Sequence, residues 1–146
     1  MRRLLLLFPA LVLVAGCGGA AAPPQGTDFV QLANTACQET NVGALGAIAE
    51  GSGGDLAAGL RETRRRGDDL ATDIARLRAP RELRIDRAAY VVAISRLAAL
   101  SGEAAGAVAQ GDDEHLDEVA DIQAPLVRRA SDLAREMGLT ACSPAS

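Results

Sequence analysis

Hydrophobic residues recur at helical spacing between residues 55 and 79, and charged residues fill most of the positions between them. Asp55 stands where an N-cap residue is expected, and the Ala79-Pro80 step ends the pattern because proline disfavours a helical residue before it. The steps alternate between four and three residues, which is typical of helices that pack along one face. The expected core positions are Leu56, Leu60, Thr63, Gly67, Leu70, Ile74 and Leu77.

Three further segments have the same kind of spacing and are predicted to be helices. Residues 28–41 carry a stripe of Phe29, Leu32, Ala33 and Ala36, with Cys37 beside it. Residues 80–110 carry a stripe of Leu83, Ala89 or Tyr90, Ile94, Leu97, Ser101, Ala104 and Val108. Residues 112–138 carry a stripe of Leu116, Val119, Gln123, Leu126, Ala130, Leu133 and Met137.

Glycine and aspartate mark the ends of these helices. Gly111 separates the last two, Asp112 or Asp113 is expected to cap the later one, and Gly138 is expected to end it. Residues 42–54 are apolar but rich in glycine, so they form either a short helix or a continuation of the first helix.

No segment alternates β-branched and polar residues over the length of a strand. The chain is therefore predicted to be all-α, with three or four antiparallel helices in a bundle. Pro125 lies inside the last predicted helix and is expected to kink it or to split it in two.

The chain begins with a short basic stretch, Met1 to Arg3, followed by an apolar run from Leu4 to Val14. About twenty apolar residues are needed to cross a bilayer as a helix, so this run is too short for a permanent span. Its length and its basic flank are those of a secretory signal peptide.

The run ends in Val14-Ala15-Gly16-Cys17, which resembles the lipobox of bacterial lipoproteins. That resemblance implies cleavage before Cys17 and attachment of acyl chains such as palmitate to its thiol. It divides the chain into a signal peptide (1–16), a lipidated Gly/Ala/Pro-rich tether (17–26) and a helical domain (27–146) on the extracytoplasmic face of the cell membrane. The alternative is a plain secretory signal with an incidental cysteine.

Two cysteines remain in the domain, Cys37 and Cys142. Thiols outside the membrane tend to oxidise, and the use of Cys17 for lipid leaves an even number, so a Cys37–Cys142 disulfide is expected. The alternative is a redox or metal pair, but the spacing is not Cys-x-x-Cys and the single histidine, His115, is far from both in sequence.

The domain is acidic and nearly free of aromatic residues. Every basic residue is arginine, and removal of a leader with two arginines lowers the formal net charge from −4 to about −6. Without a dense basic patch or aromatic residues for stacking, nucleic acid is not an expected partner.

Short motifs spread over the domain resemble those of small secreted or lipid-anchored helical proteins of high-GC Gram-positive bacteria. They are Ala36-Cys37, Leu77-Arg78-Ala79-Pro80, Gly111-Asp112 and the closing Gly138-Leu139-Thr140-Ala141-Cys142. The resemblance supports the helical bundle and the disulfide and implies no activity.

Candidate chemistry is sparse. No serine or cysteine is evidently presented to His115, so catalysis is not expected. Asp113, Asp117 and Asp121 lie four apart on one helical face and are weak candidates for a metal site, although an exposed helix face rarely supplies enough ligands. No cofactor is predicted.

Two further features each allow two interpretations. The arginine run 64–66 is either a solvated helix face, with Glu62–Arg66 and Arg65–Asp69 as i,i+4 pairs, or a docking patch. Gly102 and Gly106 allow either close helix packing or room for a ligand.

The pattern as a whole favours a non-catalytic protein-interaction module of the cell envelope, with an unidentified envelope protein as its partner. The alternative function is a carrier or sensor that binds a small ligand or a metal in or on the bundle.

Overall fold

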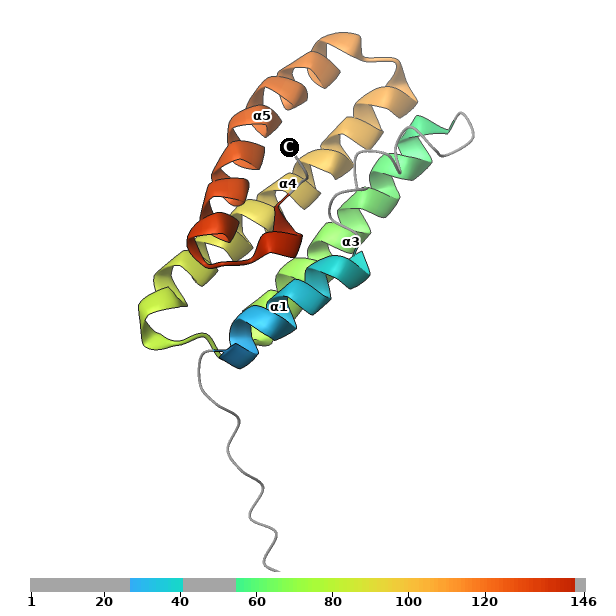
Figure 1. Cartoon of the computed structure of the whole chain (residues 1–146). Helices are drawn as coiled ribbons and strands as arrows, with labels where there is room; N and C mark the ends of the chain where they lie inside the picture. The colour runs from blue at the N-terminus through green and yellow to red at the C-terminus, as the bar shows by residue number, and fades with distance from the viewer. Residues whose placement is uncertain (1–26, 41–54, 144–146) are drawn as a thin grey trace, which may run out of the picture.

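The computed structural model describes residues 27–40 and 55–143, and in these two ranges it contains helices and no strand (Figure 1). The predicted all-α class is therefore confirmed for the described part. Its four α-helices and two short 3-10 helices are α1 (Thr27–Thr40), α3 (Leu56–Arg76), η2 (Arg81–Leu83), α4 (Arg84–Gln110), α5 (Asp113–Glu136) and η3 (Thr140–Cys142).

Helices α3 and α4 form the most extensive contact of the described part and run in opposite directions (Figure 1). Gly67 makes their close approach possible, because a Cβ atom at this position would lie 2.9 Å from Cβ of Ala98. The predicted core position at Gly67 is confirmed, and its role is to let Ala98 of α4 reach the α3 backbone.

Helix α3 ends earlier than predicted. Its last residue is Arg76 and Leu77 is already extended, with ψ of 137°, so the helix stops three residues before Ala79. The Arg87 guanidinium of α4 donates from Nη1 to the carbonyl oxygens of Leu77 at 2.6 Å and of Ala75 at 3.3 Å. A side chain from the next helix thus satisfies carbonyl groups that the end of α3 leaves without a helical donor.

Helix α4 is buried on more than one side because both α3 and α5 pack against it. The predicted stripe is confirmed at Tyr90, Ile94, Ser101 and Ala104, but the buried set also contains residues outside it: Ala93, Ala98, Leu100, Ala105 and Ala107. In the described ranges, Arg81–Gln110 is the one helical stretch long and apolar enough to cross a membrane, and 44% of its most apolar window is buried inside the protein. Its central position in the fold explains much of that apolar character.

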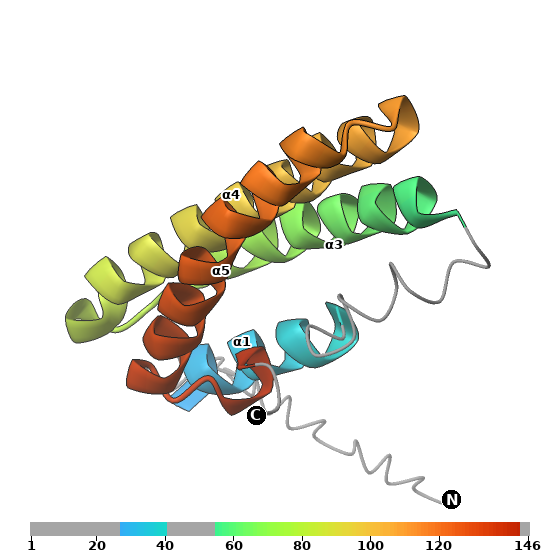
Figure 2. The same ribbon diagram turned by 90° about the horizontal axis from the view of Figure 1, so that it is seen from above.

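Helix α5 is continuous across Pro125, so the proline does not split it. Figure 2 shows that the helix changes direction about halfway along, as expected for an internal proline. Val119, before the proline, packs in a small cluster with Leu100 and Ala104 of α4. Beyond the proline, Ala130, Leu133, Ala134 and Met137 belong to the main core.

Helix α1 packs on α3 and contributes Phe29, Ala33 and Cys37 to the main core. The predicted stripe is wrong at Leu32, which is 52% exposed. It is also wrong at the start of α3, where Leu56 is exposed and Ala57 is buried instead. In both places an alanine next to the leucine, Ala33 or Ala57, is buried instead.

The predicted caps are confirmed. The carboxylates of Asp55 and Asp112 accept hydrogen bonds from the backbone N–H groups of Ala58 and His115, at 2.8 and 3.0 Å. Gly111 and Gly138 adopt left-handed backbone conformations, with φ of 68° and 74°, where each ends a helix.

Candidate functional site

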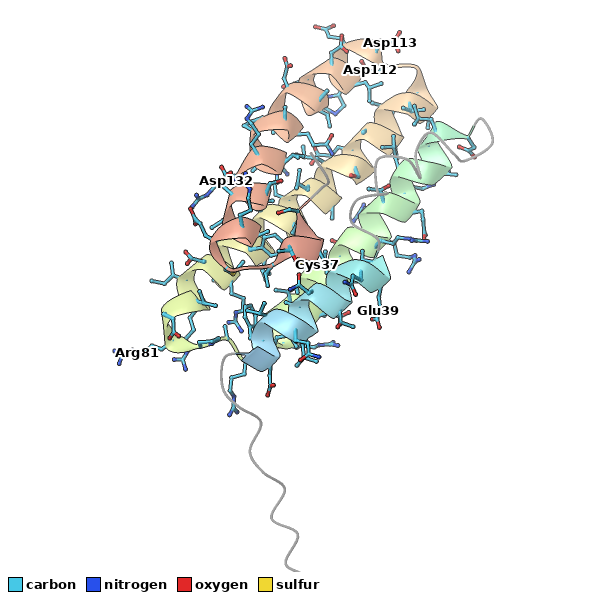
Figure 3. All side chains as sticks on the ribbon, viewed as in Figure 1. Cys37, Glu39, Arg81, Asp112, Asp113 and Asp132 are labelled. Carbon is cyan, nitrogen blue, oxygen red and sulfur yellow. A yellow bond between two sulfur atoms is a disulfide. The ribbon has the colours of Figure 1, made fainter. Side chains whose placement is uncertain are left out.

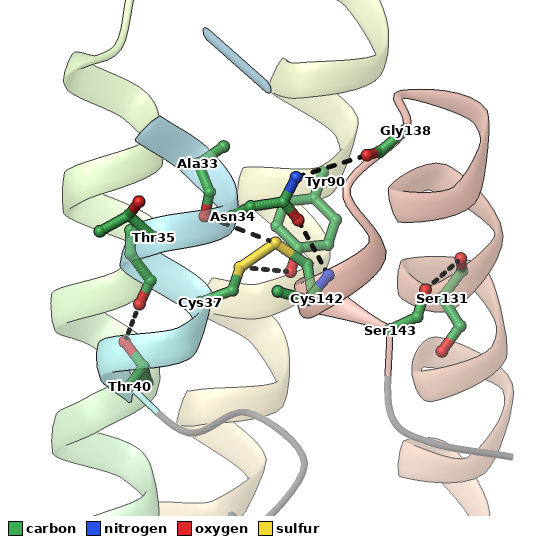
Figure 4. The surroundings of a disulfide bond; sticks show 12 residues. Ala33, Asn34, Thr35, Cys37, Thr40, Tyr90, Ser131, Gly138, Cys142 and Ser143 are labelled. Atoms are coloured by element: carbon green, nitrogen blue, oxygen red, sulfur yellow. Dashed lines mark hydrogen bonds between the residues drawn. A yellow bond between two sulfur atoms is a disulfide. The ribbon is translucent and has the colours of Figure 1, made fainter. Parts of the chain in front are cut away.

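The predicted disulfide is confirmed: Cys37 of α1 and Cys142 of η3 are bonded, with their Cα atoms 5.1 Å apart (Figure 4). Both residues are buried in the main core. The bond joins residues 105 positions apart in the sequence. It therefore ties the first described helix to the last one and closes almost the whole domain into a loop.

The backbone after α5 brings Cys142 to this position. With Gly138 in the left-handed conformation, the N–H of Leu139 donates to the carbonyl oxygen of Ala134 at 2.8 Å, and the Leu139 side chain is fully buried. The N–H of Cys142 then donates to the carbonyl oxygen of Leu139 at 3.1 Å, which forms the turn of η3. The closing segment 138–142 is thus a helix stop followed by a single tight turn.

Asn34 fixes η3 against α1, and the sequence interpretation missed it. Its Oδ1 accepts the N–H of Ala141 at 2.8 Å, and its Nδ2 lies 3.5 Å from the carbonyl oxygen of Gly138 (Figure 4). A polar residue between apolar positions of a helix is normally assigned to the solvent face. No local signal in the sequence distinguishes Asn34 from such a residue.

Tyr90 of α4 covers the disulfide from the core side. Its side chain is fully buried, and its hydroxyl can donate a weak hydrogen bond to Cys37 Sγ at 4.0 Å. Burial raises the pKa of the Tyr90 phenol well above its usual value, because the phenolate form would lose its hydration. The disulfide is therefore buried beside a neutral phenol, and no described group next to it would act as an acid or base on it.

The arginine run on α3 forms ion pairs within its own helix. Arg65 pairs with Glu62 at 2.6 Å and with Asp69 at 3.0 Å, Arg66 pairs with Glu62 at 2.7 Å, and Arg64 lies 3.7 Å from Asp68. Both predicted i,i+4 pairs are present. The hydrogen bonds from Arg65 and Arg66 lower the pKa of Glu62 to about 2. The charge of this run is locally balanced, which favours the interpretation as a solvated helix face.

A shallow groove of about 280 Å³ lies between the C-terminal end of α1 and α3. Its walls carry three acidic and two basic side chains and open widely to solvent. The lining residues are Ala36, Glu39, Thr40, Arg65, Arg66, Asp69 and Asp73. Because its walls are mostly charged and open to solvent, this groove lacks the enclosed apolar interior that a carrier of small apolar ligands needs.

The proposed metal residues Asp113, Asp117 and Asp121 are all exposed on the outside of α5. Across the described ranges, no group of three His, Cys, Asp or Glu side chains comes together in a way that could hold a metal ion. His115 lies at the edge of this acidic stretch, with Nδ1 3.3 Å from a carboxylate oxygen of Glu118. The structure therefore gathers none of these residues into a site.

The two glycines of α4 that are four residues apart do not mediate a backbone contact. At Gly102 a Cβ atom would meet the Arg64 side chain, with Cδ at 2.7 Å, and at Gly106 it would meet nothing closer than Gln110 Nε2 at 3.9 Å. The close helix contact lies at Gly67 instead. Gly102 accommodates a long side chain from α3, and Gly106 borders open space.

Cys17, the predicted signal peptide and the predicted tether lie outside the described residues, as does the segment 41–54. Comparisons of the chain with protein-family models, with curated proteins and with solved structures gave no match.

Proposed function

We propose that this protein is a lipid-anchored, extracytoplasmic helical bundle that acts as a non-catalytic interaction module of the cell envelope. The buried Cys37–Cys142 disulfide is the main support for the extracytoplasmic location, because disulfide bonds form and persist in oxidising compartments. The lipobox-like Val14-Ala15-Gly16-Cys17 supports the anchor, since a cleaved and acylated Cys17 would be held stably at the membrane surface.

The described surface supports binding more than chemistry. The arginine run 64–66 of α3 pairs with acidic neighbours on its own helix, and the acids at the start of α5 are exposed to solvent. By contrast, α4 exposes Val92 by 69% on a face that no described helix covers. We take Val92 as the point on this face at which a protein partner would contact α4.

The anchor is tested by mass spectrometry of the protein from the membrane fraction. We expect a chain that begins at Cys17 and carries acyl chains on it. Recovery of full-length or cleaved protein in the medium with an unmodified Cys17 would contradict the proposal.

The interaction is tested by photocrosslinking in intact cells. A photoreactive residue at Val92 is expected to give a defined adduct with one envelope protein, whereas the same residue at Ala109, which is also exposed on α4, is expected not to. An identical set of adducts from both positions, or none from Val92, would show that this face of α4 binds no partner.

A further inference from the structure

The two ends of the α3–α4 pair carry opposite charge. The segment 76–87, which includes η2, contains five arginines and two acidic residues, whereas the segment 112–121 at the start of α5 contains six acidic residues and no arginine. Figure 3 shows Arg81 at one end of the molecule and Asp112 and Asp113 at the other. The domain is therefore an electric dipole along α4, although its net charge is negative.

Three arginines at the η2 end, namely Arg78, Arg81 and Arg84, form what we call the basic pole. All three are exposed, and none forms an ion pair with another residue of the described ranges. The arginine run 64–66 differs, because each of its members lies beside a carboxylate. The basic pole is thus a concentration of charge without a described counterpart.

An exposed apolar side chain lies at the basic pole. Ile85 directly follows Arg84 in α4 and is 81% exposed, the largest exposed fraction among the large hydrophobic residues described. Guanidinium groups contact lipid phosphates, and an exposed aliphatic side chain can enter the boundary between headgroups and acyl chains, so the two side by side suit a bilayer surface.

The chain enters the domain at this same end. In Figures 1 and 2 the start of α1 lies towards the end of the molecule that holds the connection between α3 and α4. Nine residues separate Cys17 from Thr27, and nine residues reach about 30 Å at full extension. An acylated Cys17 would therefore keep the basic pole within reach of the membrane.

The acidic end lies too far away to oppose this contact. Helix α4 has 27 residues, so it separates the two ends by about 40 Å. Charges are screened over about 8 Å at physiological ionic strength, which is a small part of that distance. At the membrane surface the local charge of the basic pole decides the interaction. The acids at this end, Glu82, Asp86 and Asp28 in the first turn of α1, reduce that charge only in part.

We propose that the basic pole, together with Ile85, docks on anionic lipid headgroups and holds the domain upright, with the Gly111 end pointing away from the membrane. This inference rests on the proposed lipid anchor at Cys17. Each arginine near an anionic surface is worth about fivefold in the binding equilibrium, so the loss of three is expected to weaken docking by about 100-fold.

The test uses the mature lipidated protein in vesicles of phosphatidylcholine with phosphatidylglycerol, and in vesicles of phosphatidylcholine alone. A fluorophore is placed through Ala88→Cys near the basic pole or through Ala109→Cys near the other end of α4, both at exposed positions. Spin-labelled lipids are expected to quench the Ala88 probe in the anionic vesicles. They are expected to leave the Ala109 probe unquenched, and to quench the Ala88 probe much less in neutral vesicles or at high salt.

Two triple variants remove the same amount of charge from different places. Arg78→Gln with Arg81→Gln and Arg84→Gln is expected to abolish the quenching of the Ala88 probe. Replacement of the arginines 64–66 by glutamine, the matched control, is expected to preserve it. Circular dichroism shows that each variant is folded before it is compared.

Several results would overturn the inference. These are equal quenching in neutral and anionic vesicles, preferential quenching at Ala109, the same loss in both triple variants, and no quenching in any vesicle. The last result would leave an acidic protein as the natural counterpart of the basic pole.

A failure of the anchor is recognised separately. If mass spectrometry of the sample shows no acyl chain on Cys17, the proposed anchor is wrong. The full unlipidated chain is then sedimented with the same two kinds of vesicle, and binding that depends on phosphatidylglycerol and on Arg78, Arg81 and Arg84 still supports the basic pole.

Discussion

Reduction of the Cys37–Cys142 bond is the perturbation with the largest expected effect on this domain. The bond closes a loop over 105 positions of sequence, and it joins α1 to the closing turn η3, which Asn34 also holds to α1 by hydrogen bonds. Helix α1 has 14 residues, a length at which an isolated helix is marginal in water. Its attachment therefore depends on the bond and on the burial of a few side chains, above all Phe29 and Ala33.

The magnitude follows from the loop and from the core. In the chain-entropy description, a bond that closes a loop of about 100 residues stabilises the folded state by about 4.7 kcal/mol, and measured losses for native disulfides are about 2–5 kcal/mol. Complete burial of Phe29 contributes about 1.5–3 kcal/mol. A domain of this size is stable by about 5–15 kcal/mol in total. The bond therefore supplies as much stability as one or two large core side chains.

Guanidinium denaturation followed by circular dichroism measures this contribution. We expect the free energy of unfolding to fall by about 3–5 kcal/mol when the protein is reduced, and by a similar amount in the double variant Cys37→Ser with Cys142→Ser. The reductant is expected to have no effect on the double variant, which is the control. Hydrogen exchange is expected to show loss of protection in α1 and η3 before α3 and α4.

A difference below about 1 kcal/mol between the oxidised and reduced protein would refute this reasoning. It would mean either that the reduced unfolded chain is already compact or that packing alone holds α1 in place. The denaturant dependence separates these cases, because a compact unfolded state lowers the slope of the unfolding free energy with denaturant.

Three further predictions test the helix contact and the two shifted pKa values. Gly67→Ala is expected to destabilise the domain by about 1–3 kcal/mol, because its Cβ would meet Ala98 at 2.9 Å. Gly106→Ala, which has open space, is expected to stabilise the domain by up to about 1 kcal/mol. Thermal unfolding of both variants measures the difference, and equal effects would disprove the close contact at Gly67. The pKa of Glu62 is lowered, so the stability that Glu62 contributes is present above the unfolded pKa of about 4.5 and is lost as the pH falls towards 2. Carbon NMR should show the Glu62 carboxyl titrating near pH 2. The same carboxyl should titrate near its usual pKa once Arg65 and Arg66 are both replaced by glutamine. The pKa of Tyr90 is raised, so the stability that Tyr90 contributes is present below pH 10 and is lost as the pH rises further. Tyr90 is the only tyrosine and the chain has no tryptophan, so absorbance at 295 nm reports Tyr90 alone and should show no ionisation in the folded protein at pH 10. A normal titration at that pH would contradict the burial of Tyr90.

Features set by local chemistry were predicted from the sequence. The caps at Asp55 and Asp112, the helix stop at Gly138 and the i,i+4 ion pairs each depend on residues within one or two turns. The disulfide was also predicted, although it joins distant residues. Its prediction depended on the number of cysteines and their compartment rather than on geometry.

Features that depend on the relative placement of helices were not predicted. Leu100 is buried although it lies outside the expected stripe, because α5 covers a side of α4 that one helical stripe does not describe. Arg87 and Asn34 bind backbone groups of other elements, and neither has a sequence neighbour that indicates this. Leu32 was expected inside, but α1 directs Phe29, Ala33 and Cys37, which are four residues apart, towards the core.

The bend of α5 connects the internal packing of the domain with its disulfide. Helix α5 packs first with Leu100 and Ala104 and then, beyond Pro125, with the main core that contains Cys37. A straight helix of 24 residues would extend for about 36 Å along one line, so it would continue alongside α4 rather than turn towards α1 (Figure 2). Proline supplies the change of direction at the cost of one backbone hydrogen bond, and at an exposed position water can satisfy the carbonyl group left over. Because the bend delivers Gly138 and η3 to Asn34 of α1, the pairing of Cys37 with Cys142 depends on a residue that touches neither cysteine.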